Sequence, residues 1–365
     1  MRYIKIILVC TVGFFTVAAG AQPPLPSADK LDKLDQQFQA FLTEQNIPGG
    51  LVAVASRGKI IHLKPYGMAN VELAVPVSDK TVFEIGSISK QFVAAAALLL
   101  VEEGKLKLDD PVHKYLPYLP SDWMGVTMKQ LLNHTSGIPD YEEIRSYDAY
   151  RFRLTPEEII KIAHSRPVDF MPGQGWYYSN TGYFLASMVI ERIEGRPLGQ
   201  ILQNRIFGPL EMAHTRFADP EAIIANRAAG YWVNKVNELI NRNPTETSST
   251  LGAGGLLSNA EDLAKWDAAL YGDTFLSAES KAVMWTPAIL PNGESTNYGL
   301  GWSVTPYKGL TTRRHSGQVA GFTAFFNRFP EQDLTFIVFL NRYRIRGRID
   351  GAIMDTFLTG IDDQE

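Results

Sequence analysis

Segments with strand character lie near both ends of the 365-residue chain, and the region between them has helical patterns. Near the start, residues 50–55 and 60–63 are hydrophobic runs joined by a short turn that contains Gly58, which predicts a β-hairpin. Near the end, strands are predicted at 299–304, 311–317, 322–329 and 334–340. We therefore expect one sheet built from both ends of the chain, with the helical region inserted between them.

Helices are predicted on both sides of these strands. Residues 27–45 have apolar residues at helical spacing, which predicts a helix with one buried face, and residues 351–358 can form a closing helix; the apolar positions of the first are Leu31, Leu34, Phe38, Phe41 and Leu42. Residues 87–105 are rich in Ala and Leu, which indicates a buried helix. The expected fold class is α+β, with a sheet lobe at about 28–85 and 286–365 and a mostly helical lobe at about 86–285. Because the lobes would share a core boundary, we expect one domain over residues 22–365.

The composition excludes several classes of protein. Hydrophobic residues make up 45% and charged residues 20%, as in globular chains and unlike disordered or fibrous ones. The formal net charge is −4, so there is no basic excess that would indicate a nucleic-acid partner. The one cysteine, Cys10, permits neither an intramolecular disulfide nor a Cys-rich metal site. The histidines show no metal-ligand spacing, and we expect no metal and no cofactor.

The first 21 residues have the pattern of a secretory signal peptide. Arg2 and Lys5 precede an apolar run over residues 6–19, and Ala19-Gly20-Ala21 is a small-residue cleavage signature. The alternative is a retained membrane anchor, but the run is shorter than the ~20 residues that a spanning helix needs. We therefore expect a periplasmic or secreted protein without a stable membrane anchor.

The first candidate for catalysis is the pair Ser87 and Lys90. Side chains at positions i and i+3 lie on the same face of a helix, so these two would point together. If Ser87 opens the helix, its N–H belongs to the unpaired donors of the first turn, which suits a nucleophile that must stabilise an oxyanion. Lys90 can act as a base only when it is neutral, which requires a pKa lowered from about 10.4 to near 7.

Two further elements follow in order, Tyr178-Ser179-Asn180 and His315-Ser316-Gly317. Together with Ser87 and Lys90, they give the chain a pattern that resembles the serine β-lactamase and DD-peptidase superfamily, in its class C β-lactamase-like branch. That branch also holds DD-carboxypeptidases, D-amino-acid-specific peptidases and family VIII esterases. The resemblance implies a β-lactamase/transpeptidase-like fold, with an antiparallel sheet flanked by terminal helices. Its supporting stretches lie at 83–90, 131–138, 178–183, 207–212, 252–256 and 298–302.

The resemblance also implies a role for each of these residues. Ser87 would be the acylated nucleophile, Lys90 would share its proton, and Tyr178 would act as base in acylation and activate water in deacylation. A cationic Lys90 beside Tyr178 would favour the phenolate. The backbone N–H groups of Ser87 and Gln318 would form the oxyanion hole. The expected substrate-binding positions are Asn180, His315, Ser316, Gly317 and Gln318.

The sequence departs from the β-lactamase pattern at His315, where those enzymes usually carry a lysine. A histidine has a reference pKa of about 6.5 and is mostly neutral at pH 7. Arg313 or Arg314 could supply the missing charge, with a solvated pair of arginines at the sheet edge as the alternative. The run Arg342, Arg344, Arg346 and Arg348 could bind a carboxylate, with a solvated charge run as the alternative. His134 is interpreted as structural.

The expected function is therefore an exported serine hydrolase that forms an acyl-enzyme on Ser87 and cleaves amide, ester or β-lactam carbonyls. His315 favours a DD-peptidase or esterase over a dedicated β-lactamase. The alternative is a penicillin-binding sensor that is acylated without turnover. The expected partner is a small-molecule or peptide substrate, such as a D-amino-acid peptide, an ester or a β-lactam, and the expected oligomeric state is a monomer.

Overall fold

The computed structural model describes residues 23, 25–146, 151–242, 245–246 and 250–358. The predicted signal peptide, residues 1–21, lies outside the described residues. Within the described part, no helix combines the length and the apolar character that are needed to cross a membrane.

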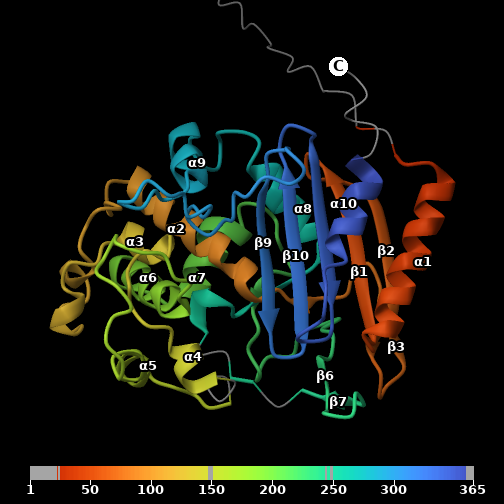
Figure 1. The fold of residues 1–365 in the computed structure, drawn as a ribbon, viewed down its shortest axis with the longest axis horizontal. Helices are drawn as coiled ribbons and strands as arrows, with labels where there is room; N and C mark the ends of the chain where they lie inside the picture. The colour runs from red at the N-terminus through yellow and green to blue at the C-terminus, as the bar shows by residue number, and fades with distance from the viewer. Residues whose placement is uncertain (1–22, 24, 147–150, 243–244, 247–249, 359–365) are drawn as a thin grey trace, which may run out of the picture.

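A six-stranded antiparallel sheet joins the two ends of the chain (Figure 1). Its strand order is β3-β2-β1-β11-β10-β9, so β1 from the start of the chain pairs with β11 from its end, with Leu51 opposite Phe339. The expected α+β class, with one sheet from both ends, is confirmed. The strands are β1 (Gly49–Ser56), β2 (Lys59–Asn70), β3 (Val75–Pro76), β9 (Arg313–Val319), β10 (Phe322–Phe329) and β11 (Leu334–Leu340).

Most of the predicted strands of this sheet are confirmed. The hairpin β1–β2 turns at Arg57 and Gly58, which both have positive φ, +47° and +81°, as two-residue hairpin turns require. The predicted strands at 322–329 and 334–340 coincide with β10 and β11, whereas β9 begins two residues later than predicted.

The predicted strand at 299–304 is wrong, because this segment is a loop that meets β9 only through an isolated bridge between Ser303 and Arg314. A Cβ atom on Gly299 would lie 2.3 Å from the carbonyl oxygen of Met284, and one on Gly301 would lie 2.8 Å from that of Lys90. Gly301 also has φ +78°. The two glycines therefore permit a close approach to helices and do not extend the sheet.

Different parts of the chain cover the two faces of the sheet. On one face, helices α1 (Ala28–Glu44) and α10 (Asp350–Leu358) lie together, at the right of Figure 1, and Phe38 and Ile353 join one hydrophobic cluster with Val338 of β11. On the other face, α2 (Ser89–Glu102) and α8 (Ala260–Ala269) contribute to the larger cluster, which includes Phe326 and Phe339. The terminal helices thus flank the sheet as predicted.

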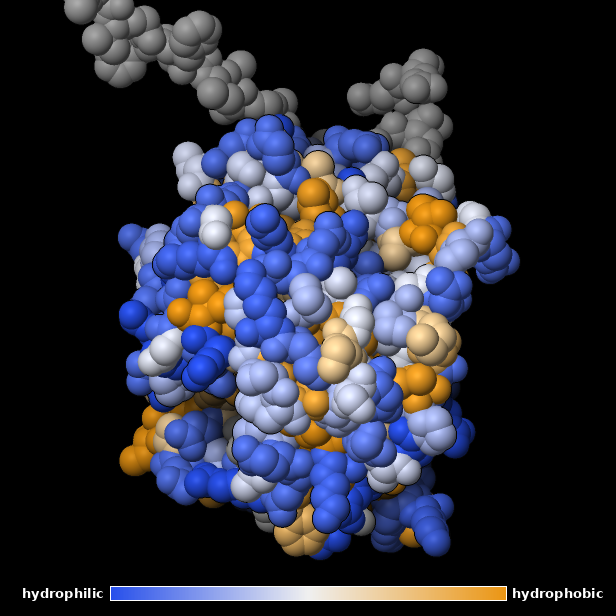
Figure 2. Space-filling view, turned by 90° about the vertical axis from the view of Figure 1, so that its left-hand side faces the viewer, coloured by the Kyte–Doolittle hydropathy of each residue, from blue (hydrophilic) through white to orange (hydrophobic). Residues whose placement is uncertain are grey.

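The region between the two parts of the sheet is mostly helical and surrounds α2, most of whose residues are buried. The face at the left of Figure 1 is largely hydrophilic, with hydrophobic residues in separate patches (Figure 2). The further helices are α3 (Met128–Leu132), α4 (Tyr141–Arg145), α5 (Pro156–Ala163), α6 (Asn180–Glu194), α7 (Leu198–Leu202) and α9 (Ala278–Trp285). The short strands are β4 (Phe83–Glu84), β5 (Arg216–Phe217) and β8 (Leu256–Ser258), which form one sheet, and the hairpin of β6 (Tyr231–Val233) and β7 (Leu239–Asn241).

Candidate active site

Ser87 lies at the junction between β4 and α2, in a 3₁₀ turn over Gly86–Ile88. The predicted buried helix therefore begins at Ser89, two residues after Ser87. Gly86 has φ +51°, and its carbonyl accepts a hydrogen bond from Ser89 Oγ at 2.6 Å. The turn leaves the Ser87 side chain partly exposed while its neighbours are buried. Ser87 is thus presented at the surface from a rigid, buried support.

Strand β9 lies directly beside this turn, and glycines on both sides make the approach possible. A Cβ atom on Gly86 would lie 2.7 Å from the backbone nitrogen of Gln318. A Cβ atom on Gly317 would lie 1.8 Å from the carbonyl oxygen of Ile85 and 3.1 Å from the backbone nitrogen of Ser87. The nitrogens of Ser87 and Gln318, which were predicted to act together, are therefore neighbours.

Lys90 lies one helical turn beyond Ser87 and is completely buried. Its Nζ donates to Ser87 Oγ at 3.0 Å, to Asn180 Oδ1 at 2.7 Å and to the carbonyl oxygen of Ala253 at 2.6 Å. Burial lowers the pKa of Lys90 to about 7, although the negative charges of Glu142 and Asp140 act in the opposite direction. This is the direction that a lysine acting as a base requires.

Tyr178 lies just before α6, in a cluster of aromatic rings. Its ring centroid is 4.2 Å from that of His134 and 4.8 Å from Lys90 Nζ, and its hydroxyl is hydrogen-bonded to Ser87. Burial raises the pKa of Tyr178 well above its usual value, although the hydrogen bond from Ser87 lowers it. The expected shift toward the phenolate is therefore wrong for the resting site, because desolvation is the largest effect on the pKa of Tyr178 and the carboxylates of Glu142 and Asp140 raise it further.

His134 also contacts the segment that carries Tyr178. Its Nδ1 accepts a hydrogen bond from the backbone N–H of Ser179 at 3.1 Å. Burial lowers the pKa of His134 well below its usual value, so the imidazole is neutral. The sequence predicts a structural role for His134, and its contacts with Ser179 and with the ring of Tyr178 indicate that it helps to position Tyr178.

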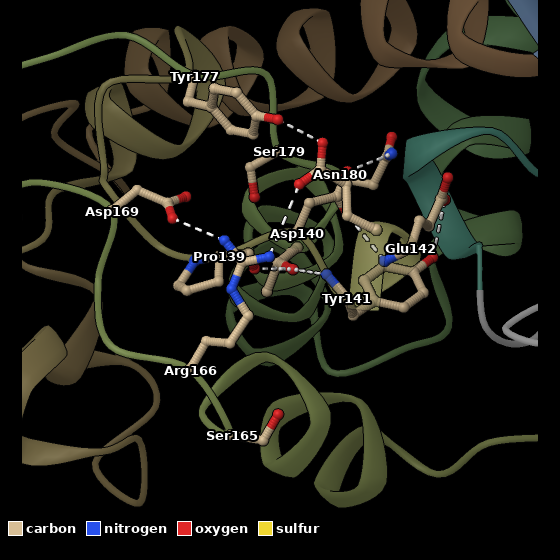
Figure 3. Close-up of polar contacts among 12 residues, drawn as sticks. Pro139, Asp140, Tyr141, Glu142, Ser165, Arg166, Asp169, Tyr177, Ser179 and Asn180 are labelled. Atoms are coloured by element: carbon tan, nitrogen blue, oxygen red, sulfur yellow. Dashed lines mark hydrogen bonds and ion pairs between the residues drawn. The ribbon is translucent and has the colours of Figure 1, made fainter. Parts of the chain in front are cut away.

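Asn180 is the first residue of α6, and its amide connects Lys90 to a carboxylate. Ser179 is the N-cap of the helix, and its Oγ accepts from the N–H of Gly182. Asn180 Oδ1 accepts from Lys90 Nζ. Its Nδ2 donates to Asp140 Oδ2 at 3.0 Å (Figure 3). Burial raises the pKa of Asp140 to about 6.

His315 is buried on β9 and holds two hydrogen bonds as a neutral imidazole. Its Nδ1–H donates to the carbonyl oxygen of Ser316 at 2.6 Å, so Nε2 accepts from the hydroxyl of Tyr298 at 2.8 Å. Burial, followed by the charge of Lys90, lowers the pKa of His315 to about 3. Ser316 is exposed on the opposite face of the strand, and its carbonyl oxygen is the acceptor for His315 Nδ1–H.

The arginines near His315 do not gather around it. Arg313 stacks on Trp285 at 5.3 Å and donates to the carbonyl oxygen of Thr312. Arg314 lies on the other face of β9, opposite Asn327 of β10. In the arginine run that follows β11, Arg342 is buried, whereas Arg344, Arg346 and Arg348 are exposed. Arg348 pairs with Asp350 at 2.6 Å.

Sequence reasoning missed four contributors to the site: Ala253, Asp140, Tyr298 and the contact of His134 with Tyr178. Ala253 and Tyr298 stand in stretches that carried the resemblance, but Ala253 acts through its backbone carbonyl, which no side-chain pattern reveals. Asp140 lies two residues after the stretch 131–138, and a search for acidic residues near such stretches would have found it. Among the described residues, no cluster of His, Cys, Asp and Glu could hold a metal ion.

Comparisons with known proteins identify the family. A family model described as Beta-lactamase matches residues 34–352. Penicillin-binding protein 4* of Bacillus subtilis is 33% identical over 320 residues, which cover 82% of this chain and 70% of that protein.

Two solved structures support the same assignment. A penicillin-binding protein homologue from Pyrococcus abyssi has 30% identity and a TM-score of 0.78, over 91% of this chain and 77% of the other. A D-amino acid amidase from Ochrobactrum anthropi has 26% identity and a TM-score of 0.77, over 91% and 100% of the two chains. This chain therefore belongs to the beta-lactamase family, within the serine β-lactamase and DD-peptidase superfamily, and is a serine hydrolase.

Proposed function

We propose that this chain is an exported serine hydrolase that forms an acyl-enzyme on Ser87 and releases it to water. The observation that carries the proposal is the position of Lys90, whose buried Nζ lies 3.0 Å from Ser87 Oγ and is held by two further acceptors. A serine hydroxyl is a weak nucleophile, and an adjacent base activates it. In this site, the base is a lysine whose pKa burial has lowered to about 7.

Acylation begins when Ser87 Oγ attacks the carbonyl carbon and its proton passes to neutral Lys90. The negative charge on the carbonyl oxygen is stabilised by the N–H groups of Ser87 and Gln318. The bond from the carbonyl carbon to the leaving nitrogen or oxygen then breaks. The proton on Lys90 passes through the Tyr178 hydroxyl to the leaving group, and the acyl-enzyme and the amine or alcohol remain.

Deacylation repeats these steps with water as the nucleophile. A water molecule attacks the acyl carbon and gives one proton through Tyr178 to Lys90. The bond to Ser87 Oγ breaks, and Oγ takes that proton back, which restores the resting enzyme. The raised pKa of Tyr178 supports a neutral phenol that relays protons, and it favours Lys90 as the group that first accepts the proton of Ser87.

The preferred substrates in this proposal are peptides that contain D-amino acids, or esters, ahead of β-lactams. His315 supports this order, because a neutral imidazole offers no positive charge to the carboxylate of a β-lactam. The relationship to a D-amino acid amidase from Ochrobactrum anthropi points the same way.

A panel of three substrates tests the proposal: nitrocefin, a short-chain p-nitrophenyl ester and a peptide ending in D-Ala-D-Ala. We expect turnover of the ester or the peptide to exceed that of nitrocefin, and we expect Ser87→Ala to abolish it. Unchanged turnover by Ser87→Ala would rule out Ser87 as the nucleophile. A dominant rate on nitrocefin would instead reverse the order of substrates.

The second candidate is a penicillin-binding sensor that is acylated but does not turn over. The observation that favours it is the 33% identity to a penicillin-binding protein of Bacillus subtilis. Mass spectrometry after exposure to penicillin separates the two candidates. A long-lived adduct without turnover of any panel substrate supports the sensor, whereas an adduct that disappears as product accumulates supports the hydrolase.

The proposal of export rests on residues 1–21, with Arg2 and Lys5 ahead of an apolar run and the signature Ala19-Gly20-Ala21. We expect the mature chain to begin near Gln22 and to be recovered from the periplasm or the medium. Determining the N-terminus of the native protein tests this, and a chain that retains Arg2 would contradict it.

A further inference from the structure

Asp140 lies just before α4 and is 4% exposed. One carboxyl oxygen, Oδ2, accepts from Asn180 Nδ2 at 3.0 Å, and the other, Oδ1, accepts from the backbone N–H of Glu142 at 3.0 Å (Figure 3). We propose that Asp140 is a positioning residue, whose carboxylate fixes the orientation of the Asn180 amide and thereby holds Lys90 against Ser87. This assignment rests on the function proposed above for Ser87 and Lys90.

The orientation of an asparagine amide depends on its partners, because its oxygen and its nitrogen occupy nearly equivalent positions. Asn180 stands between an ionised carboxylate, which only accepts hydrogen bonds, and Lys90 Nζ, which keeps N–H groups to donate to Asn180 Oδ1 whether it is charged or neutral. One orientation satisfies both neighbours, with Nδ2 toward Asp140 and Oδ1 toward Lys90. The opposite orientation would bring two acceptors together at one end and two donors at the other.

Burial increases the energetic difference between the two orientations of the Asn180 amide. Asn180 is 8% exposed and Lys90 is completely buried, so solvent has little access to replace a lost hydrogen bond. Without Asp140, the Asn180 amide would lose the partner that defines its orientation. The Nζ of Lys90 would then lose one of the two acceptors that hold it beside Ser87 Oγ.

Asp140 itself is held in place by the contact between its loop and the start of α6. Ser179 Oγ donates to the carbonyl oxygen of Ile138 at 3.0 Å, and Thr181 Oγ1 donates to that of Pro139 at 2.7 Å. The backbone N–H of Tyr141 donates to Thr181 Oγ1 at 3.0 Å. These bonds lie on both sides of Asp140 along the chain, so the carboxylate approaches Asn180 from a fixed backbone.

The proposal also concerns charge, because several ionisable groups surround Lys90. The negative charges of Asp140 and Glu142 raise its pKa, against the larger effect of burial. Burial raises the pKa of Asp140 to about 6, so its carboxylate is ionised above that pH. The groups that face Lys90 are Asp140 and Glu142 at the start of α4, His134 after α3, Tyr178 before α6, Tyr183 on α6 and His315 on β9.

Three variants of the full chain distinguish two effects of Asp140: its effect on the orientation of Asn180 and the effect of its charge on the pKa of Lys90. All three are assayed on the best substrate of the panel. Asp140→Asn keeps the size of the side chain and can still cap α4, but a donating NH2 group replaces one of the two oxygens that accept from Glu142 N–H and Asn180 Nδ2. We expect kcat above pH 8 to fall at least ten-fold. We also expect the acid limb of kcat/KM to move to lower pH, because a charge that raises the Lys90 pKa is gone.

Two further variants complete the test. Asp140→Glu keeps the charge but displaces the carboxylate, so kcat should fall while the acid limb stays in place. Glu142→Gln is the charge-matched control, because it removes the other carboxylate that acts on Lys90 and leaves the bond to Asn180 intact. We expect it to move the acid limb to lower pH and to retain kcat.

The assignment is overturned if Asp140→Asn retains kcat within two-fold of the wild type. It is also overturned if Glu142→Gln loses as much kcat as Asp140→Asn, because charge alone would then explain the effect. Should Asp140→Asn fail to fold, the assignment is overturned if Asp140→Glu retains kcat within two-fold of the wild type, or if Glu142→Gln loses as much kcat as Asp140→Glu. Turnover by Ser87→Ala would refute the proposed function, whereas an active Asp140→Asn beside an inactive Ser87→Ala refutes only the role of Asp140.

Discussion

Replacing the buried Lys90 by methionine should change the stability of the protein in a way that depends on pH. The two side chains have similar length, so the core stays filled, but the ionisable group is gone. The hydrogen bonds from Nζ to Asn180 and Ala253 are lost at every pH, so they contribute a constant destabilisation. The difference in the free energy of unfolding between the wild type and Lys90→Met also has a part that varies with pH. This part measures the cost of burying the ammonium group.

The size of this part follows from the pKa of Lys90, which burial lowers from 10.5 to about 7. At about 1.4 kcal/mol per unit, the shift corresponds to about 5 kcal/mol against the folded state while the lysine is charged. Below pH 7 both states bind the proton, so the full penalty is present. Between pH 7 and 10.5 the unfolded state binds one proton more, so the free energy of unfolding of the wild type rises with pH.

Between pH 6 and pH 9, the wild type should therefore gain about 3 kcal/mol of stability relative to Lys90→Met. Urea unfolding followed by the fluorescence of the six tryptophans measures this difference at each pH. Lys161→Met is the matched control, because it makes the same substitution at an exposed helical lysine. A difference between wild type and Lys90→Met that is the same at pH 6 and pH 9 would refute the reasoning. The variant should also lose at least about 100-fold in kcat as a base is removed.

Two further predictions concern Gly86 and Glu84, in the segment that leads to Ser87. Gly86→Ala should lower kcat by about 100-fold, because its Cβ would lie 2.7 Å from the backbone nitrogen of Gln318. Gly104→Ala is the control, because Gly104 also has a positive φ, +69°, but has open space around it, so this variant should strain the backbone and keep kcat. A kcat of Gly86→Ala within two-fold of the wild type contradicts this prediction. Glu84→Gln should lower the free energy of unfolding by about 3 kcal/mol, because it removes the charge of a buried carboxylate that pairs with Arg242 at 2.7 Å and Arg227 at 3.0 Å. Urea unfolding checks it, and a loss under about 1 kcal/mol would show that Glu84 is dispensable.

The sheet could be predicted from the sequence because its strands are marked by long hydrophobic runs between turn residues. Residues 322–329 and 334–340 are such runs, and the structure has β10 and β11 with these bounds. The segment 299–304 has a similar composition, yet it forms a loop. Its glycines at 299 and 301 serve contacts with Met284 and Lys90, which lie far away in the sequence. Local pattern cannot reveal such long-range contacts.

The candidate site could be predicted only as far as its side chains form motifs. Ser87, Lys90, Tyr178 and Asn180 were named from their spacing and the resemblance, and the structure brings all four together. The direction of the Tyr178 pKa was predicted wrongly, because a motif shows which residues are neighbours and does not show how deeply they are buried. The degree of burial decides whether a neighbouring lysine or desolvation prevails.

The position of Asn180 between Lys90 and Asp140 explains how the site can contain both a carboxylate and a lysine that acts as a base. A carboxylate in direct contact with a lysine favours the ammonium form and raises the pKa by 1–3 units, roughly. An amide placed between the two groups forms a hydrogen bond to each of them, but it carries no full charge itself. Burial can then still hold the pKa of Lys90 at about 7 while Asp140 and Glu142 are nearby. The carboxylate of Asp140 thus orients the site through Asn180 without keeping Lys90 protonated. A protonated Lys90 could not accept the proton of Ser87.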